Sequence, residues 1–295
     1  MIPSSEDCSV KEALESYRQY LDRQPVSAHT RRNYLQRVKR YLDYLEGSLE
    51  GLRALSDEVE RDFQMRDFKA WLLTSGASPS TINSTLSAVD NFYLSRGMKQ
   101  AKLKRLDLPR QAPRALEQDE ERRLLKALAR TSLRNKAVVM VMMHAGLRIS
   151  EVAALNVGDI SLTARRGEVL VRCGKGLKQR TIPINQELRE VLLKYLAEEG
   201  CRESLEPMFV SQKQNRLSMA AIDKVIRMLG AQACVDLSAH DLRHHFITRL
   251  VRQGTDIVTI AELAGHARLE TVRRYSLPTA EEKQQALEKL CRYAS

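Results

Sequence analysis

Residues 167–184 read GEVLVRCGKGLKQRTIPI, and this stretch decides the fold class because here the chain changes from helical to alternating periodicity. Apolar and polar residues alternate on either side of a turn with two glycines, which predicts an antiparallel β-hairpin. Lys175 lies between the glycines, near the predicted tip. The positions that carry the pattern are Val169 and Val171 before the turn, and Thr181, Ile182 and Ile184 after it.

The sequence around this hairpin has helical periodicity. Residues 116–160 and the chain beyond residue 185 carry apolar residues at helical spacing, so residues 116–295 are predicted to form a mostly helical domain with a small antiparallel sheet. The closing segment, TAEEKQQALEKLCRYA, has an apolar stripe that fits packing on its own domain or docking on a neighbouring protomer. The stripe consists of Ala286, Leu287, Leu290 and Tyr293.

The first 98 residues are predicted to form a separate, all-helical domain of about four helices. Amphipathic stripes begin after Ser27 and after Ser78, which are suitable N-caps. The first of these helices has a basic outer side that includes Arg31 and Arg32. The second carries short polar groups that suit phosphate contact or a solvated face, namely Asn83, Ser84 and Ser87.

Residues 99–115 are predicted to be a basic linker between the two domains. Six Lys or Arg residues stand against one Asp in KQAKLKRLDLPRQAPR, a net charge of +5, and the segment has two prolines and no sustained period. Its first half supplies three candidate DNA contacts, namely Lys102, Lys104 and Arg105.

The composition indicates a globular protein with a polyanionic partner. The 295 residues carry 48 Lys and Arg against 37 Asp and Glu, a net charge of +11 that favours nucleic acid. The N-terminus has no secretory pattern, and the longest apolar run, 137–143, is far shorter than the roughly 20 residues of a membrane helix. Five scattered cysteines form no zinc or redox motif. We therefore expect a cytoplasmic, nucleoid-associated protein without a membrane partner.

The segment SAHDLRHHFITRL, residues 238–250, carries the sharpest local signal for chemistry. Ser238 and Asp241 fit a capping box and place a helix start at His240. His240 and Arg243 then share one face of the first turn, where the positive end of the helix dipole favours a phosphate. The alternative is that His240 caps the helix and Arg243 pairs with a carboxylate. Two further histidines fit packing or surface positions, namely His244 and His245.

A second candidate lies in HAGLRISEVAAL, residues 144–155. Arg148 precedes a helix that Ser150 can cap. An arginine fork can hold two phosphate oxygens at once, which a lysine cannot do. The simpler alternative is a surface ion pair between Arg148 and Glu151.

A third candidate lies in AELAGHARLETVRRYSLPT, residues 261–279. His266 follows a glycine that breaks one helix, and it can donate to a phosphate or be an ordinary turn residue. The next segment runs into Tyr275, which stands behind Arg273 and Arg274 and ahead of a proline. The tyrosine fits either an exposed helix end or a nucleophile.

Together these side chains form a set suited to phosphoryl transfer, with cations around a phosphate, a lysine as proton donor and a tyrosine as nucleophile. Fixed cations stabilise the charge on the phosphate oxygens, so the set requires no metal, ATP or other cofactor. The motifs GLRISEVAAL, CGKGLKQRTIPI, HDLRHHF and LAGHARLETVRRY resemble those of the tyrosine recombinases, the integrase-like site-specific recombinases, of the Xer or transposon-encoded type. The residues that carry the resemblance are, in order, Arg148, Lys175, His240, Arg243, His266 and Tyr275.

The resemblance implies a core-binding domain at residues 1–98 and a catalytic domain at 116–295, which together clamp double-stranded DNA at a specific core site. It implies a tetramer on DNA held by a C-terminal exchange helix, and leaves room for accessory proteins. Tyr275 would attack a phosphodiester and leave a 3′-phosphotyrosyl link and a free 5′-hydroxyl. The other implied roles are phosphate binding by Arg148 and Arg243, assistance by His240 and His266, structural support by Glu151, protonation of the 5′-oxygen by Lys175 or its rival Lys178, and DNA contacts by Arg273 and Arg274.

Two other functions stay open at this point. Type IB topoisomerases use the same chemical groups, and an inactive relative would be a DNA-binding regulator. The chain also departs from the family pattern before Gly-His, after Arg243 and after the tyrosine, which bears on the subfamily and leaves every reacting group in place. These departures are Ala264, His245, Ser276 and Leu277.

Overall fold

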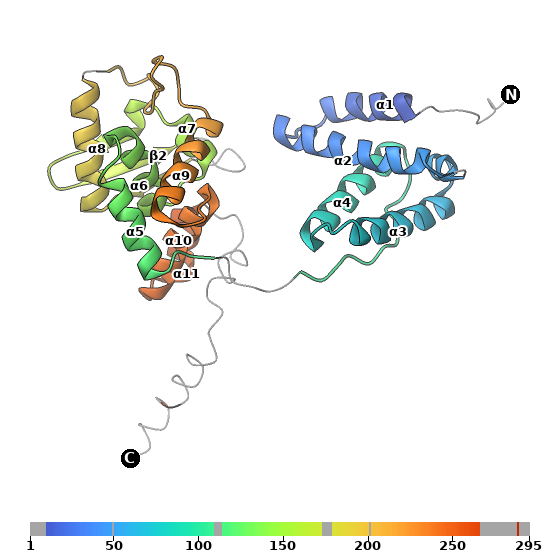
Figure 1. Ribbon diagram of the computed structural model, residues 1–295. Helices are drawn as coiled ribbons and strands as arrows, with labels where there is room; N and C mark the ends of the chain where they lie inside the picture. Colours follow the sequence, from blue (N-terminus) through green and yellow to red (C-terminus); the bar gives the residue numbers. More distant parts are fainter. Residues whose placement is uncertain are drawn as a thin grey trace. The chain divides into compact units, whose positions relative to one another are not determined.

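In the computed structural model, contacts divide the chain into two units, Met1–Pro109 and Arg110–Ser295. The structure describes residues 10–48, 50–108, 114–172, 179–200, 202–265 and 288. Figure 1 shows that helices dominate both units, whereas the described strands belong to the second. The predicted fold class, mainly α with a small antiparallel sheet, is confirmed.

The described secondary structure of the N-terminal unit is all helical. Its elements are α1 (Val10–Asp22), α2 (Ala28–Glu46), a 3-10 helix η1 (Gly51–Leu55), α3 (Glu58–Thr74) and α4 (Pro79–Ser95). The predicted caps are present, since the hydroxyl of Ser27 accepts from the Thr30 amide and that of Ser78 from the Thr81 amide. Proline is the first residue of α4, where its missing N–H is not needed.

Aromatic side chains fill the core of this unit. Tyr41 and Tyr93 are fully buried, and their hydroxyls share one hydrogen bond of 2.9 Å. The Tyr17 hydroxyl donates to Asn91 at 2.7 Å. Because each buried hydroxyl has a partner, the aromatic rings are buried without an uncompensated polar group.

Residues 99–108 pack on the N-terminal unit, although the sequence predicts them as part of a linker. The Asn83 amide donates to the Leu106 carbonyl at 2.8 Å and accepts from the Leu106 N–H at 2.9 Å. Arg105 pairs with the buried carboxylate of Asp90. Hydrophobic residues of the segment also cover the core, namely Ala101, Leu103 and Leu106.

The second unit combines seven described α-helices with a three-stranded sheet. Its elements are α5 (Gln118–Leu128), α6 (Leu133–Ala145), α7 (Ile149–Ala154), η2 (Val157–Asp159), β1 (Ile160–Leu162), β2 (Gly167–Val171), β3 (Arg180–Pro183), α8 (Gln186–Glu199), α9 (Met219–Ala233), α10 (Ala239–Arg252) and α11 (Ile257–Ala264). The strands are antiparallel in the order β1-β2-β3. Val169 lies opposite Ile182 and Val171 opposite Arg180, which confirms the predicted hairpin, while its tip lies outside the described residues.

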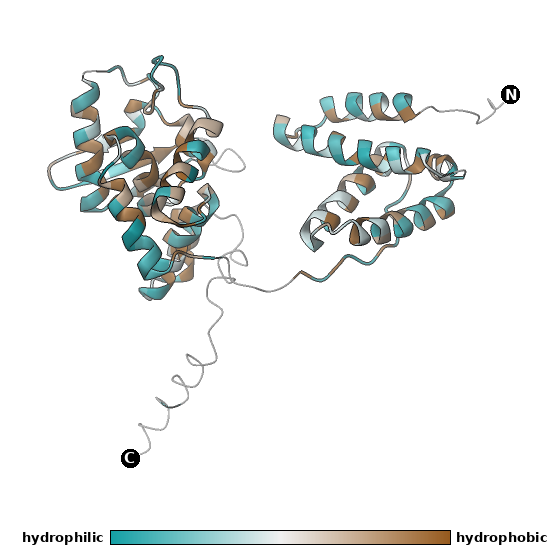
Figure 2. Cartoon of the chain, in the orientation of Figure 1, coloured by the Kyte–Doolittle hydropathy of each residue, from teal (hydrophilic) through white to brown (hydrophobic). Residues whose placement is uncertain are grey.

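Helix α6 is the centre of this unit. Every residue from Ala137 to Met143 is buried, because α6 packs against both α8 and α10. A helix that is hydrophobic on all sides has to lie in the interior. Figure 2 shows the same division in colour, with hydrophobic residues gathered inside the unit and hydrophilic ones on the outer faces of α5 and α8.

Helix α11 packs with α10 in a second, smaller core. Five buried residues form it, namely Phe246, Ile247, Ile260, Ala261 and Ala264.

Within the described ranges, no helix is long and apolar enough to cross a membrane. The same part of the chain contains no group of three or more residues that suits a metal ion.

Candidate active site

Arg148 lies in the sharp turn between α6 and α7. Gly146 ends α6 with φ +62°, and a Cβ there would meet the Phe246 ring at 2.2 Å, so this position requires glycine. Arg148 is the N-cap of α7, and its backbone N–H donates to the Glu151 carboxylate at 2.9 Å. The expectation that Ser150 caps this helix is wrong, because the helix begins after Arg148 and the Glu151 carboxylate accepts the Arg148 N–H. Ser150 lies inside the helix and is exposed.

Glu151 is a buried carboxylate shared by two arginines. Its side chain is 2% exposed, so the surface ion pair considered from the sequence is a buried one. The Arg148 Nη1 donates to Glu151 Oε1 at 2.8 Å, while Arg180 donates from Nη1 and Nη2 to the two oxygens at 3.0 and 2.8 Å. Burial acts to raise the pKa of Glu151, but the hydrogen bonds from Arg180 and Arg148 outweigh it and lower the pKa, so the group is ionised.

Arg180 is the residue that the sequence reasoning missed. Its strand register contains the signal, because Arg180 lies opposite Val171, which is buried. Opposed residues of an antiparallel pair point to the same face. An arginine on the inner face needs an anionic or carbonyl partner, and Glu151 is that partner.

Arg243 lies on α10 and is 3% exposed. Its guanidinium donates to the carbonyl oxygens of Gly146 and Ala264. Both of these acceptors are backbone carbonyls. The capping box of Ser238 and Asp241 is confirmed, although α10 starts at Ala239, one residue before the predicted position.

The C-terminal end of α11 brings the arginines together. Three consecutive carbonyls accept from three different guanidinium groups: Leu263 from Arg180 Nε at 3.2 Å, Ala264 from Arg243, and Gly265 from Arg148 Nη2 at 3.1 Å. The last carbonyls of a helix lack partners within the helix and carry the negative end of its dipole. This end therefore orients several cations at one place.

His240 lies near these arginines, on the first turn of α10. Burial lowers the pKa of its imidazole, and repulsion from Arg243 and Arg148 lowers it further against the opposing effect of Asp241. The imidazole is therefore neutral at pH 7. Its ring meets that of His244 edge to face, with centroids 3.8 Å apart. His245 is 3% exposed and is a packing residue near Glu121.

Six of the predicted site residues lie outside the described residues. Two are the predicted proton donor and its rival, Lys175 and Lys178. The others are His266, Arg273, Arg274 and the predicted nucleophile Tyr275. The predicted C-terminal exchange helix also lies outside the described residues, except for Glu288. The described part of the site therefore consists of Arg148, His240 and Arg243, with Glu151 and Arg180 beside them.

The predicted DNA contacts of the N-terminal unit divide into two groups. Asn83, Ser84, Ser87 and Arg105 have partners inside the unit, since the two hydroxyls donate to carbonyls one turn back, Arg105 pairs with Asp90 and Asn83 holds Leu106. The Arg31 guanidinium pairs with Asp22 at 3.0 Å. The exposed cations of the set are Arg32, Lys102 and Lys104.

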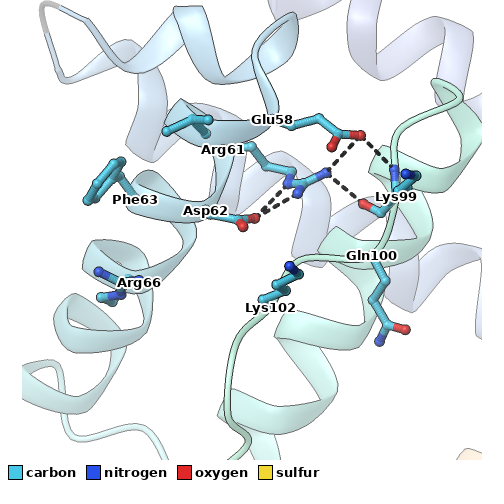
Figure 3. Close-up of a pocket in the computed structure, with 9 residues that line it drawn as sticks. Glu58, Arg61, Asp62, Phe63, Arg66, Lys99, Gln100 and Lys102 are labelled. Atoms are coloured by element: carbon cyan, nitrogen blue, oxygen red, sulfur yellow. Dashed lines mark hydrogen bonds and ion pairs between the residues drawn. The ribbon is translucent and has the colours of Figure 1, made fainter.

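A cavity of about 490 Å³ lies in the N-terminal unit, between the start of α3 and residues 99–102. Figure 3 shows Arg61 at its centre, with Asp62 and the Lys99 carbonyl as partners. Lys102 lines this cavity, which contains none of the predicted catalytic residues.

The two helical units and the arginine site fit one class of protein, the DNA integrases, and the comparisons with known proteins identify that class. A family model described as "Phage integrase family" matches residues 114–282, and one described as "Phage integrase, N-terminal SAM-like domain" matches residues 14–95. Tyrosine recombinase XerA of Thermococcus kodakarensis is 34% identical over 283 residues, which cover 94% of this chain and 95% of that protein. The chain belongs to the phage integrase family, the tyrosine recombinases.

Two solved structures share the fold. The XerH site-specific recombinase bound to difH substrate has a TM-score of 0.70 at 22% identity, and the match covers 95% of this chain and 84% of that one. The Tn1549 transposon integrase in complex with circular intermediate DNA also has a TM-score of 0.70, at 17% identity over 94% of this chain and 99% of the other.

Proposed function

We propose that this chain is a site-specific DNA recombinase that cleaves and rejoins strands through a 3′-phosphotyrosyl link at Tyr275. The observation that supports it best is the convergence of Arg148, Arg243 and His240 near the end of α11. The buried carboxylate of Glu151 pairs with Arg148 and also with a further cation, Arg180. A site with surplus positive charge and a neutral imidazole suits a phosphodiester and its transition state.

In the proposed reaction, the Tyr275 oxygen forms a bond to phosphorus while the bond to the 5′-oxygen breaks. Lys175, or Lys178 in its place, gives a proton to the leaving 5′-oxygen, and the neutral imidazole of His240 is a suitable acceptor for the phenolic proton. Arg148 and Arg243 stabilise the charge on the non-bridging oxygens, so the step needs neither a divalent metal nor ATP. Attack by another 5′-hydroxyl reverses the step and rejoins the strands.

The proposed substrate is double-stranded DNA with a specific core site. The XerH neighbour is a complex with its difH substrate, and the XerA relative covers nearly the whole chain. In our proposal residues 1–98 bind the core site and residues 99–115 connect the domains, with residues 99–108 packed on the N-terminal unit. Residues 116–295 catalyse the reaction as a tetramer held by the C-terminal segment. Arg32, Lys102 and Lys104 are the exposed N-terminal cations that we assign to DNA.

The test is covalent capture. The full-length protein is incubated with a library of nicked duplexes in EDTA and denatured, and the DNA that stays attached is sequenced. We expect adducts at one recurrent sequence, joined through the 3′-phosphate. Adducts with no sequence preference would favour a topoisomerase, and DNA binding without any adduct would favour a regulator.

Two variants make this test specific. Tyr275→Phe should bind DNA and give no adduct, because only the nucleophilic oxygen is lost. Arg243→Ala should lose on the order of 100-fold in cleavage rate, the usual effect of removing one transition-state donor. Arg227→Ala is the matched control, since it removes a guanidinium from an exposed pair with Asp223 on α9. Wild-type cleavage by Arg243→Ala would remove that arginine from the site.

A further inference from the structure

Arg180, the first residue of β3, connects two parts of the candidate site. Two of its N–H groups donate to the two oxygens of Glu151, at 3.0 and 2.8 Å. Its third donor, Nε, reaches the Leu263 carbonyl at 3.2 Å. The side chain is 12% exposed, so these contacts are made away from most of the solvent.

The first consequence concerns charge. Glu151 carries one negative charge and contacts two guanidinium groups, so the cluster keeps one positive charge. Without Arg180, the buried carboxylate would have Arg148 as its remaining cation, and the Arg148 guanidinium would be neutralised by it. A guanidinium that is fully paired with a carboxylate has less charge and fewer N–H groups to offer a phosphate.

The second consequence concerns position. Gly265 lies flat against the Arg180 guanidinium, since a Cβ at Gly265 would be 2.8 Å from Arg180 Cζ. The carbonyls of Gly265 and of the preceding residue, Ala264, orient the two arginines that we assign to the phosphate. The Gly265 carbonyl accepts from Arg148, and the Ala264 carbonyl accepts from Arg243. Arg180 thus supports the turn against which both arginines are held.

We propose that Arg180 is a positioning residue for strand cleavage: it balances the charge of Glu151 so that Arg148 stays available to the scissile phosphate, and it fixes the end of α11. This inference rests on the proposed function. Arg180 acts through Arg148 and Arg243 and does not itself contact the phosphate.

The experiment compares single-turnover cleavage and DNA affinity for Arg180→Ala, on the site recovered by covalent capture with the wild-type protein. We expect cleavage to fall on the order of 100-fold, the usual cost of a catalytic group displaced by about 1 Å. The dissociation constant should change little, because Arg32, Lys102 and Lys104, the cations that we assign to DNA in the N-terminal unit, are untouched by the substitution. Arg227→Ala again serves as the control for the loss of one guanidinium.

A double variant separates charge balance from a merely structural role. Glu151→Gln combined with Arg180→Ala removes one negative and one positive charge together, so Arg148 is no longer neutralised. We expect the double variant to cleave about ten-fold faster than Arg180→Ala alone. A structural role predicts the reverse, since two buried contacts are then lost instead of one.

Thermal unfolding followed by circular dichroism shows whether each variant folds, and Arg180→Gln replaces Arg180→Ala if the latter does not. Wild-type rates in the Arg180 variant would overturn the proposal, and so would a double variant as slow as the single one. Absence of adducts with the wild-type protein would instead contradict the proposed function, so the two failures are distinguishable.

Discussion

The two units each contain a buried arginine cluster, and the clusters differ in their balance of charge. In the N-terminal unit, one guanidinium meets two carboxylates. Arg61 is 3% exposed and donates to Asp62 at 3.0 and 2.7 Å, with Glu58 at 3.8 Å and the Lys99 carbonyl at 2.6 Å (Figure 3). In the second unit, two guanidiniums share the single carboxylate of Glu151.

This difference distinguishes a structural ion cluster from one that can bind an anion. The charge of Arg61 is fully compensated, and the cluster holds the backbone of Lys99 against the start of α3. The cluster at Glu151 keeps an excess positive charge beside Arg243 and His240. The ratio of cations to carboxylates in a cluster, more than the burial of its arginine, therefore indicates whether the cluster can bind a phosphate.

The largest effect is expected at the shared carboxylate. Glu151→Gln leaves two partly buried guanidiniums close together without their counter-charge, which should lower the free energy of unfolding of the second unit by about 3–5 kcal/mol. Denaturant unfolding followed by far-UV circular dichroism measures the loss. A change below about 1 kcal/mol would mean that Arg148 and Arg180 do not depend on this carboxylate.

A smaller effect is expected at Arg61. Arg61→Met should cost about 2 kcal/mol, because the charged hydrogen bonds are lost while Asp62 and Glu58 can turn to water. The single tryptophan, Trp71 on α3, reports unfolding of this unit by fluorescence. The cleavage rate per folded molecule should not change. A catalytic defect in the folded variant would contradict the structural role of this cluster.

Asn83 should have a more modest effect. Asn83→Ala removes both hydrogen bonds to Leu106 and should cost about 1 kcal/mol for the net loss. Ser87→Ala on the same helix is the matched control, since its hydroxyl is exposed and donates to a carbonyl one turn back. Equal stabilities of the two variants, measured by Trp71 fluorescence in denaturant, would show that Asn83 does not hold residues 99–108.

The smallest effect is expected from pH, and it should be confined to the second unit. Burial lowers the pKa values of His144, His240 and His245 in the folded protein. The unfolded state then binds more protons below about pH 6.5, so the stability contributed by these groups is complete above that pH and falls as the pH decreases. Unfolding measured by circular dichroism at pH 7 and 5.5 tests this prediction. Greater stability at pH 5.5 than at pH 7 would contradict it.

The features that the sequence predicts correctly are local ones. The caps at Ser27, Ser78 and Ser238 and the hairpin each depend on residues a few positions apart, so their hydrogen bonds leave a short pattern. Arg148 and Arg243 were assigned through the family motifs, and the structure brings both to the end of α11.

The features that the sequence missed depend on distant partners. Arg180 meets a carbonyl 83 residues away, and Asn83 meets a backbone group 23 residues away. Nothing near Asn83 distinguishes an amide that binds the protein's own backbone from one that faces DNA. The sequence does not predict the correct start of α7, because the carboxylate of Glu151, and not the hydroxyl of Ser150, accepts the backbone N–H of the N-cap residue Arg148.

The three carbonyls at the end of α11 also connect the site to local stability. α11 has eight residues, of which three are buried, Ile260, Ala261 and Ala264, while Leu263 packs partly buried against the main core. Elements with few buried contacts open at a lower free energy than the whole domain. One such opening withdraws the acceptors of Arg148, Arg180 and Arg243 together. The amides of α11 should therefore exchange with solvent faster than those of α6, and the lifetime of the phosphate site should follow α11.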